Sequence, residues 1–330
     1  MVTIRDVATK AGVSVATVSR VINNKGQATP ETVTKVLEVI KELGYKPNVV
    51  ARSLTSRKSN TIALFVPTIS NPFFPELARG VEDVAHSYGF NIFLCNTDDE
   101  RTKMKNYLDS LRDRYVDGII INSLNLTNED LEQLHSHGIP AVTLDRTFST
   151  HKFSSITVKH RLGAQLATKH LIDIGCKRIG LIRGPEDDST AVQRMWGYRD
   201  CVKEYDWFDQ TWMALGDFSV KSGYLCMKEL FQRHPDIDGV FASNDLMAIG
   251  LLKAAYEWGR KVPDELSIVG FDGIDMSQYT IPPISTIRQP IYEMGRMAME
   301  ELMRLMREPS SNFIKKELDV ELILRESSMR

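Results

Sequence analysis

Residues 13–23 read Val-Ser-Val-Ala-Thr-Val-Ser-Arg-Val-Ile-Asn, and the organisation of the first 46 residues follows from them. Ser14 is expected to cap a short helix, because its hydroxyl can accept hydrogen bonds from the free amides of the first turn. In that helix Val18, Val21 and Ile22 face inward. The opposite face presents Val15, Ala16, Ser19, Arg20 and Asn23.

An earlier helix is predicted over residues 4–11, whose apolar positions follow the i, i+3, i+4, i+7 spacing of one helical face. Thr3 is its expected N-cap. Gly12 then supplies a tight turn, since glycine tolerates backbone angles that other residues resist. Two short helices joined in this way are typical of a helix-turn-helix, whose second helix enters the major groove of DNA.

A third helix is predicted after these two. Thr29 is its expected N-cap, Pro30 its first residue, and Gly44 lies just past its end. The residues expected to close the small core from this helix are Val33, Val36, Leu37, Ile40 and Leu43.

The pattern fits any small helical domain, and the distribution of charge favours DNA binding. Residues 1–60 contain ten Lys/Arg and four Asp/Glu, which gives a net charge of +6. The whole chain carries −2, so residues 61–330 carry −8. A basic head on an acidic body is expected where only one end of a protein faces phosphates.

Four segments carry a family resemblance: residues 3–8, 12–14, 16–23 and 45–54. On these the chain resembles the lac/gal repressor family of bacterial transcription regulators, and the resemblance extends over essentially the whole sequence. It implies that residues 48–54 form a hinge helix only on operator DNA, with Leu54 as an apolar wedge in the minor groove. A segment this short is not a stable helix alone in water. The alternative is a plain linker.

The resemblance assigns roles to the recognition helix. Arg20 matches an arginine that can bond guanine O6 and N7. Val15 and Ala16 are short and apolar, so they suit contacts with thymine methyl groups. The polar residues beside them are expected to contact phosphates, which position a protein without specifying a sequence. The predicted DNA contacts are Thr3, Ser14, Val15, Ala16, Thr17, Ser19, Arg20, Asn23, Asn48, Ala51, Leu54 and Thr55.

From residue 61 short apolar strands alternate with helices. Strands are predicted at residues 61–66, 91–95, 118–121, 141–144, 179–182, 239–242 and 267–270. Helices are predicted at residues 75–88, 104–114, 162–174 and 246–258. This alternation predicts parallel sheets with crossover helices, and the strands are too many for one small sheet. The predicted fold is a small all-α helix-turn-helix head plus an α/β core of two doubly wound parallel-sheet lobes. The resemblance adds that the core is like the periplasmic sugar-binding proteins.

The predicted domains are a head (1–46), a hinge helix with linker (47–60) and an effector-binding and dimerisation domain (61–330). The resemblance implies three crossovers between the lobes, near residues 158–161, 286–290 and 317–320. The N-lobe then comprises about 61–159 plus 290–318, and the C-lobe about 160–289 plus 319–330. A ligand is expected at the carboxyl ends of the strands.

Candidate ligand residues follow the predicted strands, where such folds place function. They are Asn71, Phe73, Phe74, Asp145, Arg146, Arg194, Phe218, Asn244, Asp272 and Gln289. The set resembles the pocket of periplasmic ribose-binding proteins and sugar-responsive repressors. The phenylalanine rings suit the C–H faces of a sugar, and the polar side chains suit its hydroxyls.

Each candidate also has a structural interpretation. The phenylalanine pair can belong to the core, Asp145 with Arg146 can form a surface ion pair, and Asn244 with Asp245 can cap the next helix. The joint match to one pocket favours a sugar, and a ribose-like sugar such as D-ribose in particular. Residues 184–188 offer acids where purine-responsive relatives carry an arginine, which counts against a purine.

Parts of the sequence also fit two other functions. One is a regulator of the catabolite-control type, with a phosphorylated carrier protein or a phosphorylated metabolite as corepressor; residues 78–83 are reminiscent of that branch. The other is an enzyme, or a sugar-binding protein without a DNA function. An enzyme is disfavoured because the sequence contains no GxxxxGK[ST], GxSxG or HExxH motif.

The cysteines, two histidines and the absence of a targeting signal in the sequence bear on metal binding, disulfides and location. The cysteines form no CxxC pair, so neither zinc nor disulfides are expected, and buried free thiols are. His135 and His137 are too close together to form a metal-binding face. No secretory signal or membrane span is predicted. The expectation is a cytoplasmic, homodimeric repressor that binds operator DNA and a small sugar, with no cofactor or metal. The four cysteines are Cys95, Cys176, Cys201 and Cys226.

Overall fold

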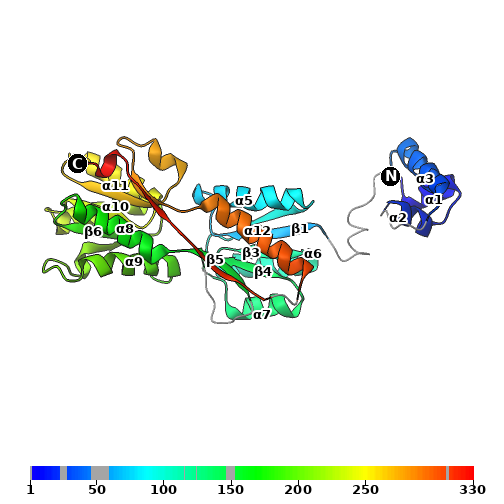
Figure 1. Cartoon of the computed structure of the whole chain (residues 1–330), viewed down its shortest axis with the longest axis horizontal. Coiled ribbons are helices and arrows are strands. Elements are labelled where there is room, and N and C mark those ends of the chain that lie inside the picture. Colours follow the sequence, from blue (N-terminus) through cyan, green and yellow to red (C-terminus); the bar gives the residue numbers. More distant parts are fainter. Residues whose placement is uncertain are drawn as a thin grey trace. The chain divides into compact units, whose positions relative to one another are not determined.

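The computed structural model describes residues 2–22, 28–45, 59–114, 116–123, 125–145, 153–309 and 312–330. The chain divides into two compact units, one ending at Ser59 and the other beginning at Asn60 (Figure 1). The predicted hinge helix lies outside the described residues.

The first unit is a three-helix head. Its helices are α1 (Ile4–Ala11), α2 (Val15–Ile22) and α3 (Pro30–Leu43). Thr3 and Asp6 form a reciprocal capping box on α1, and Thr29 caps α3. Gly12 and Gly44 follow α1 and α3 with left-handed φ angles of 65° and 59°, which glycine adopts without strain.

The apolar residues of the three helices pack into one small core. Leu37 was predicted to belong to it, and this is wrong: its exposed fraction is 51%. Successive helical residues are 100° apart, so Leu37 falls beyond the edge of the stripe that Val36 defines, and Val39 is buried instead. The buried members are Val7, Ala8, Ala11, Val18, Val21, Val36 and Val39.

The N-lobe of the second unit contains a six-stranded sheet in the order β11-β5-β4-β3-β1-β2, with every neighbouring pair parallel. Its strands are β1 (Thr61–Val66), β2 (Asn91–Asn96), β3 (Gly118–Ile121), β4 (Ala141–Leu144), β5 (Ser154–Val158) and β11 (Lys315–Leu318). Helices α5 (Phe73–Ser87) and α12 (Ile291–Arg307) pack on one face, and α6 (Arg101–Arg114) and α7 (Asn128–Ser136) on the other.

The C-lobe repeats this arrangement in the order β12-β10-β9-β8-β6-β7. Its strands are β6 (Ile179–Arg183), β7 (Met213–Leu215), β8 (Gly239–Ala242), β9 (Ser267–Asp272), β10 (Ser285–Arg288) and β12 (Glu321–Ile323). Its helices are α8 (His160–Asp173), α9 (Ser189–Val202), α10 (Val220–Arg233) and α11 (Asp245–Glu257). Short 3-10 helices lie at η1 (Gln210–Trp212), η2 (Asp275–Gln278) and η3 (Glu326–Ser328). Contrary to an all-parallel expectation, edge strand β12 is antiparallel to β10.

The chain passes between the lobes three times. The first connection joins β5 to α8, the second joins β10 to α12, and the third joins β11 to β12 (Figure 1). In each lobe the parallel strands therefore direct their carboxyl ends, and the loops that follow them, toward one edge of the sheet.

Candidate ligand site and nucleic-acid interface

A cavity of about 410 Å³ is lined by the loops that follow strands of both lobes. The N-lobe contributes loops after β1 to β4, and the C-lobe contributes loops after β6 to β10. This volume is within the usual range for small-molecule sites. Arg146 lies outside the described residues, and the other nine predicted ligand residues all line the cavity. Their roles as ligands stay predictions.

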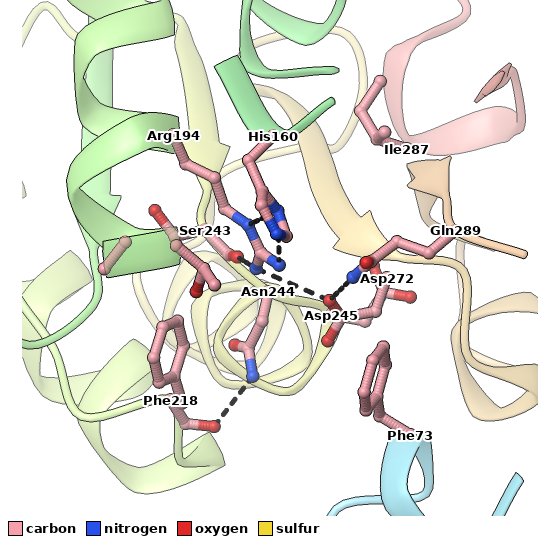
Figure 2. A network of polar contacts seen from close by, with 12 residues as sticks. Phe73, His160, Arg194, Phe218, Ser243, Asn244, Asp245, Asp272, Ile287 and Gln289 are labelled. Carbon is pink, nitrogen blue, oxygen red and sulfur yellow. Dashed lines mark hydrogen bonds and ion pairs between the residues drawn. The ribbon is translucent and has the colours of Figure 1, made fainter. Parts of the chain in front are cut away.

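The C-lobe wall is organised around Arg194, a residue of α9 that is 5% exposed. One guanidinium nitrogen donates to the Ser243 carbonyl and lies 3.5 Å from Asp272 Oδ1. Gln289 Nε2 donates to the same carboxylate oxygen at 2.8 Å (Figure 2). The guanidinium carbon also lies 3.8 Å from the centre of the Phe271 ring. These contacts fix side chains from α9, from the end of β9 and from the connection after β10 before any ligand arrives.

Burial alters the pKa of Asp272 in this wall and of Asp245, which is fully buried and does not line the cavity. It raises the pKa of Asp272 to about 8, although Arg194 acts to lower it, and raises the pKa of Asp245 to about 6. Asp272 also has a φ of 115°, a backbone angle that residues other than glycine rarely adopt. Gln289 Oε1 is buried and has no hydrogen-bond partner among the described residues. It therefore has an unused acceptor capacity in the cavity wall.

Asn244 has a structural role as well as a place in the lining. Its Oδ1 accepts from the amide of Met247 at 2.9 Å and so caps α11, while its Nδ2 donates to the carbonyl of Phe218 at 3.0 Å. Each amide atom retains capacity for one further bond. Asp245 does not cap this helix; its Oδ2 accepts from the amides of Gly273 and Ile274.

The N-lobe wall carries two adjacent rings and an amide. Asn71 Oδ1 accepts from the amide of Phe73 at 3.1 Å, which leaves its Nδ2 as the donor for the cavity. The rings of Phe73 and Phe74 meet edge to face with centres 5.1 Å apart. Phe73 belongs both to the N-lobe core and to the cavity lining, so the structural and ligand-binding interpretations apply together. Asp145 follows β4 with a left-handed φ of 55°.

Several lining residues were not predicted from the sequence. Each follows a strand, so the same rule of carboxyl ends would have found them. In the loop after β7, Phe218 was predicted but Asp217 was not, because that short strand was not predicted. Asp98 is ionised, since hydrogen bonds from Lys103 and Asn96 lower its pKa. The unpredicted polar residues include Asp98, Asp99, Asn122, Ser123, Asp188 and Asp217.

In the head, α2 presents a polar and largely exposed face. Val15 is 41% exposed, and Ala16 and Arg20 are also exposed. Ser14 Oγ accepts from the amide of Thr17 at 3.1 Å, and the two hydroxyls lie 2.9 Å apart, so Ser14 caps α2 as predicted. Ser19 is half-buried on the same helix. The predicted contacts Asn23, Asn48, Ala51, Leu54 and Thr55 lie outside the described residues.

The described part of the chain contains neither a metal-binding cluster nor a helix that could span a membrane. No group of three or more His, Cys, Asp or Glu side chains there could hold a metal ion. Nor is any described helix long and apolar enough to cross a membrane. All four cysteines are free; Cys201 is only half-buried, whereas the other three are buried as predicted. His135 and His137 are exposed at the end of α7.

A three-helix head with an exposed recognition helix, joined in sequence to a two-lobed domain with an interlobe cavity, defines a ligand-responsive DNA-binding regulator. Family comparison agrees with this class. Residues 3–48 match bacterial regulatory proteins of the lacI family. Residues 59–320 match the periplasmic binding proteins and sugar binding domain of the LacI family. The chain therefore belongs to the LacI family and is a DNA-binding repressor.

Individual relatives cover nearly the whole chain. A ribose operon repressor of Halalkalibacterium halodurans is 43% identical over 99% of this chain and 97% of its own length. Catabolite control protein A of Priestia megaterium is 38% identical over 92% of each chain.

Solved structures of LacI family regulators are similar to this chain as well. A LacI family regulator from Enterococcus faecium with bound ribose is 33% identical, with a TM-score of 0.74, over 81% of this chain and 98% of its own. The lac repressor dimer bound to operator and an anti-inducer is 27% identical, with a TM-score of 0.88, over 100% of this chain and 99% of its own.

Proposed function

We propose that the chain is a homodimeric repressor of a sugar-utilisation operon that releases its operator when a ribose-like sugar binds between the lobes. The observation that carries this proposal is the single cavity lined by nine predicted ligand residues from both lobes. Its aromatic rings, amides and carboxylates match the alternating C–H and hydroxyl surfaces of a sugar. A ribose operon repressor among the relatives and a ribose-bound structural neighbour support this choice.

The charge of the lining favours an uncharged sugar over a phosphorylated one. Six aspartates and one arginine belong to the described lining. The arginine, Arg194, is already committed to Asp272, His160 and the Ser243 carbonyl. A phosphate group would therefore be removed from water and placed among carboxylates without a free cation from these residues. The described part of the lining therefore favours an uncharged sugar over a phosphorylated metabolite; Arg146, the other predicted cation, lies outside the described residues.

The head is proposed to read a pseudo-palindrome, one half-site for each subunit, with α2 in the major groove. Exposed Arg20 is the proposed reader of a guanine, and Leu54 the proposed wedge at the centre of the operator. Arg20→Ala should cost about 1–3 kcal/mol at one base position and relax the choice there. Ser19→Ala, in contrast, should weaken binding similarly for all operator variants. Unchanged base preference in Arg20→Ala would remove Arg20 from this role.

The sugar is tested by calorimetric titration of the purified chain with D-ribose, D-ribose 5-phosphate and guanine. Binding of D-ribose alone is the expected result. Tighter binding of the phosphate ester would favour a phosphorylated effector, and tight guanine binding would favour a purine effector. If none of these compounds binds, a protein corepressor is favoured. This second candidate is supported by the 38% identity to catabolite control protein A.

A further inference from the structure

His160 holds an unusual position behind the cavity. It is the first residue of α8, directly after the first connection between the lobes. Its side chain is buried and is not part of the cavity lining. Nε2 lies 3.0 Å from Oδ1 of Asp145 in the N-lobe, and Nδ1 lies 3.3 Å from two nitrogens of Arg194 in the C-lobe (Figure 2 shows the Arg194 contact). One side chain thus contacts a lining residue from each lobe.

The partners of His160 determine where its proton lies. A guanidinium has no acceptor, so Nδ1 must accept from Arg194, and the single proton of the neutral ring lies on Nε2. Nε2 then donates to Asp145. Burial lowers the pKa of His160, although Asp145 acts to raise it, so the neutral form is favoured. The ring also stacks on Phe271, with centres 6.0 Å apart and planes inclined by 30°.

A continuous series of polar contacts passes through this ring. It runs from Asp145 to His160, Arg194, Asp272 and Gln289. His160 begins α8 after the first connection between the lobes, and Gln289 lies on the second, between β10 and α12. A second cavity of about 490 Å³, lined in part by Asp145, His160 and Glu317, lies beside the first link of the series. This cavity adjoins the two side chains whose contact joins the lobes.

We propose that His160 is a positioning residue that couples the sugar to the arrangement of the two lobes. The inference rests on the proposed function, because it needs a sugar that contacts Asp145 on one side and Arg194 on the other. A sugar hydroxyl that hydrogen-bonds to Asp145 or Arg194 competes with the hydrogen bond between that side chain and His160. The Asp145–His160 bond crosses between the lobes, so its strength depends on how the lobes lie. Ligand occupancy and lobe arrangement then affect the same bond.

The test measures the coupling factor, which is the Kd of D-ribose with operator bound divided by its Kd without operator. The variants His160→Asn and His160→Gln each keep one of the two hydrogen bonds of the ring and remove the other. The asparagine amide lies near the position of Nδ1 and keeps the bond from Arg194 but not the bond to Asp145. The glutamine amide reaches the position of Nε2 and keeps the bond to Asp145. Thr157→Val is the matched control, since Thr157 Oγ1 donates to the same Asp145 oxygen at 3.3 Å from within the N-lobe.

His160→Asn should lower the coupling factor at least about fivefold, while His160→Gln and Thr157→Val should stay within about twofold of the wild type. A wild-type coupling factor in His160→Asn would overturn the proposal. Loss of coupling in His160→Gln would also overturn it, and this result stands even if His160→Asn does not fold. Equal loss in Thr157→Val would show that only the orientation of Asp145 matters, which contradicts a bond between lobes. Absence of ribose binding in the wild type would instead refute the proposed function.

Discussion

The C-lobe wall of the cavity joins side chains from a helix, a strand end and an interlobe connection, whereas the N-lobe wall holds its side chains mainly through bonds within their own loops. Arg194 and Gln289 both contact one carboxylate oxygen of Asp272. Asn71, in contrast, bonds the amide of Phe73 two residues away, and its cavity-facing donor acts alone. The C-lobe wall should therefore respond to mutation as a unit, and the N-lobe wall residue by residue.

The largest effect is expected from Asp272→Ala. This variant leaves the buried Arg194 guanidinium and the Gln289 amide without the oxygen that both contact, and leaving a buried polar group without its partner costs about 1–3 kcal/mol, more for a charged group. D-Ribose affinity should fall more than about 100-fold, while operator affinity stays within about threefold. Calorimetry and fluorescence anisotropy with a labelled operator measure the two quantities. Loss of operator binding as well would show that Asp272 is needed for folding of the whole chain and not only for the cavity.

A smaller effect in the same wall is expected from Gly184→Ala. A Cβ at this position would lie 2.3 Å from Cζ of Phe218, so the ring must move from its present place in the lining. D-Ribose affinity should fall about tenfold, because a misplaced ring loses contact area with the sugar. An unchanged ribose Kd would show that the Phe218 ring does not contact the sugar.

The N-lobe wall should tolerate Phe74→Leu better. Leucine keeps much of the apolar volume of Phe74 but lacks the flat face of the ring, and no polar contact is broken. The expected loss of ribose affinity is about threefold to tenfold, with an unchanged unfolding temperature. A loss as large as that of Asp272→Ala would contradict the difference between the two walls.

The smallest effect is expected in the pH dependence of stability, to which Asp272 in the C-lobe wall should contribute. The pKa of Asp272 is raised from 3.8 to about 8, so the folded state binds its proton more tightly than the unfolded chain does. Its stabilising contribution is therefore complete below about pH 4 and is lost as the pH rises toward 8. Asp272→Asn does not titrate there.

The free energy of unfolding in denaturant, measured from pH 5 to pH 8 for both proteins, gives the comparison. Wild type should lose stability relative to Asp272→Asn as the pH rises. Parallel curves would show that Asp272 is ionised over the whole range.

Sequence reasoning succeeded where local rules decide the structure. Ser14, Thr29 and Gly12 act through neighbouring backbone groups, and long apolar runs produced the central strands at the predicted places. It failed for β5, β7, β10, β11 and β12, which have three to five residues. β7, β11 and β12 lie at sheet edges, and β5 and β10 each lie between an edge strand and the centre of a sheet, where pairing with strands distant in the sequence decides.

The candidate site shows the same division. Its lining residues follow strands, so their positions could be anticipated from the alternation of strands and helices together with the family resemblance. His160 gave no such signal. Its importance depends on contacts with residues 15 and 34 positions away along the chain, and no local pattern predicts such contacts.

The most direct test of the central claim is a calorimetric titration of D-ribose into the wild-type chain alone and into its complex with operator DNA. Because linkage is reciprocal, a sugar that releases operator must bind the operator complex more weakly. The account predicts a Kd at least about tenfold higher in the complex. Equal affinity in both titrations would contradict it, and tighter binding in the complex would make the sugar a corepressor.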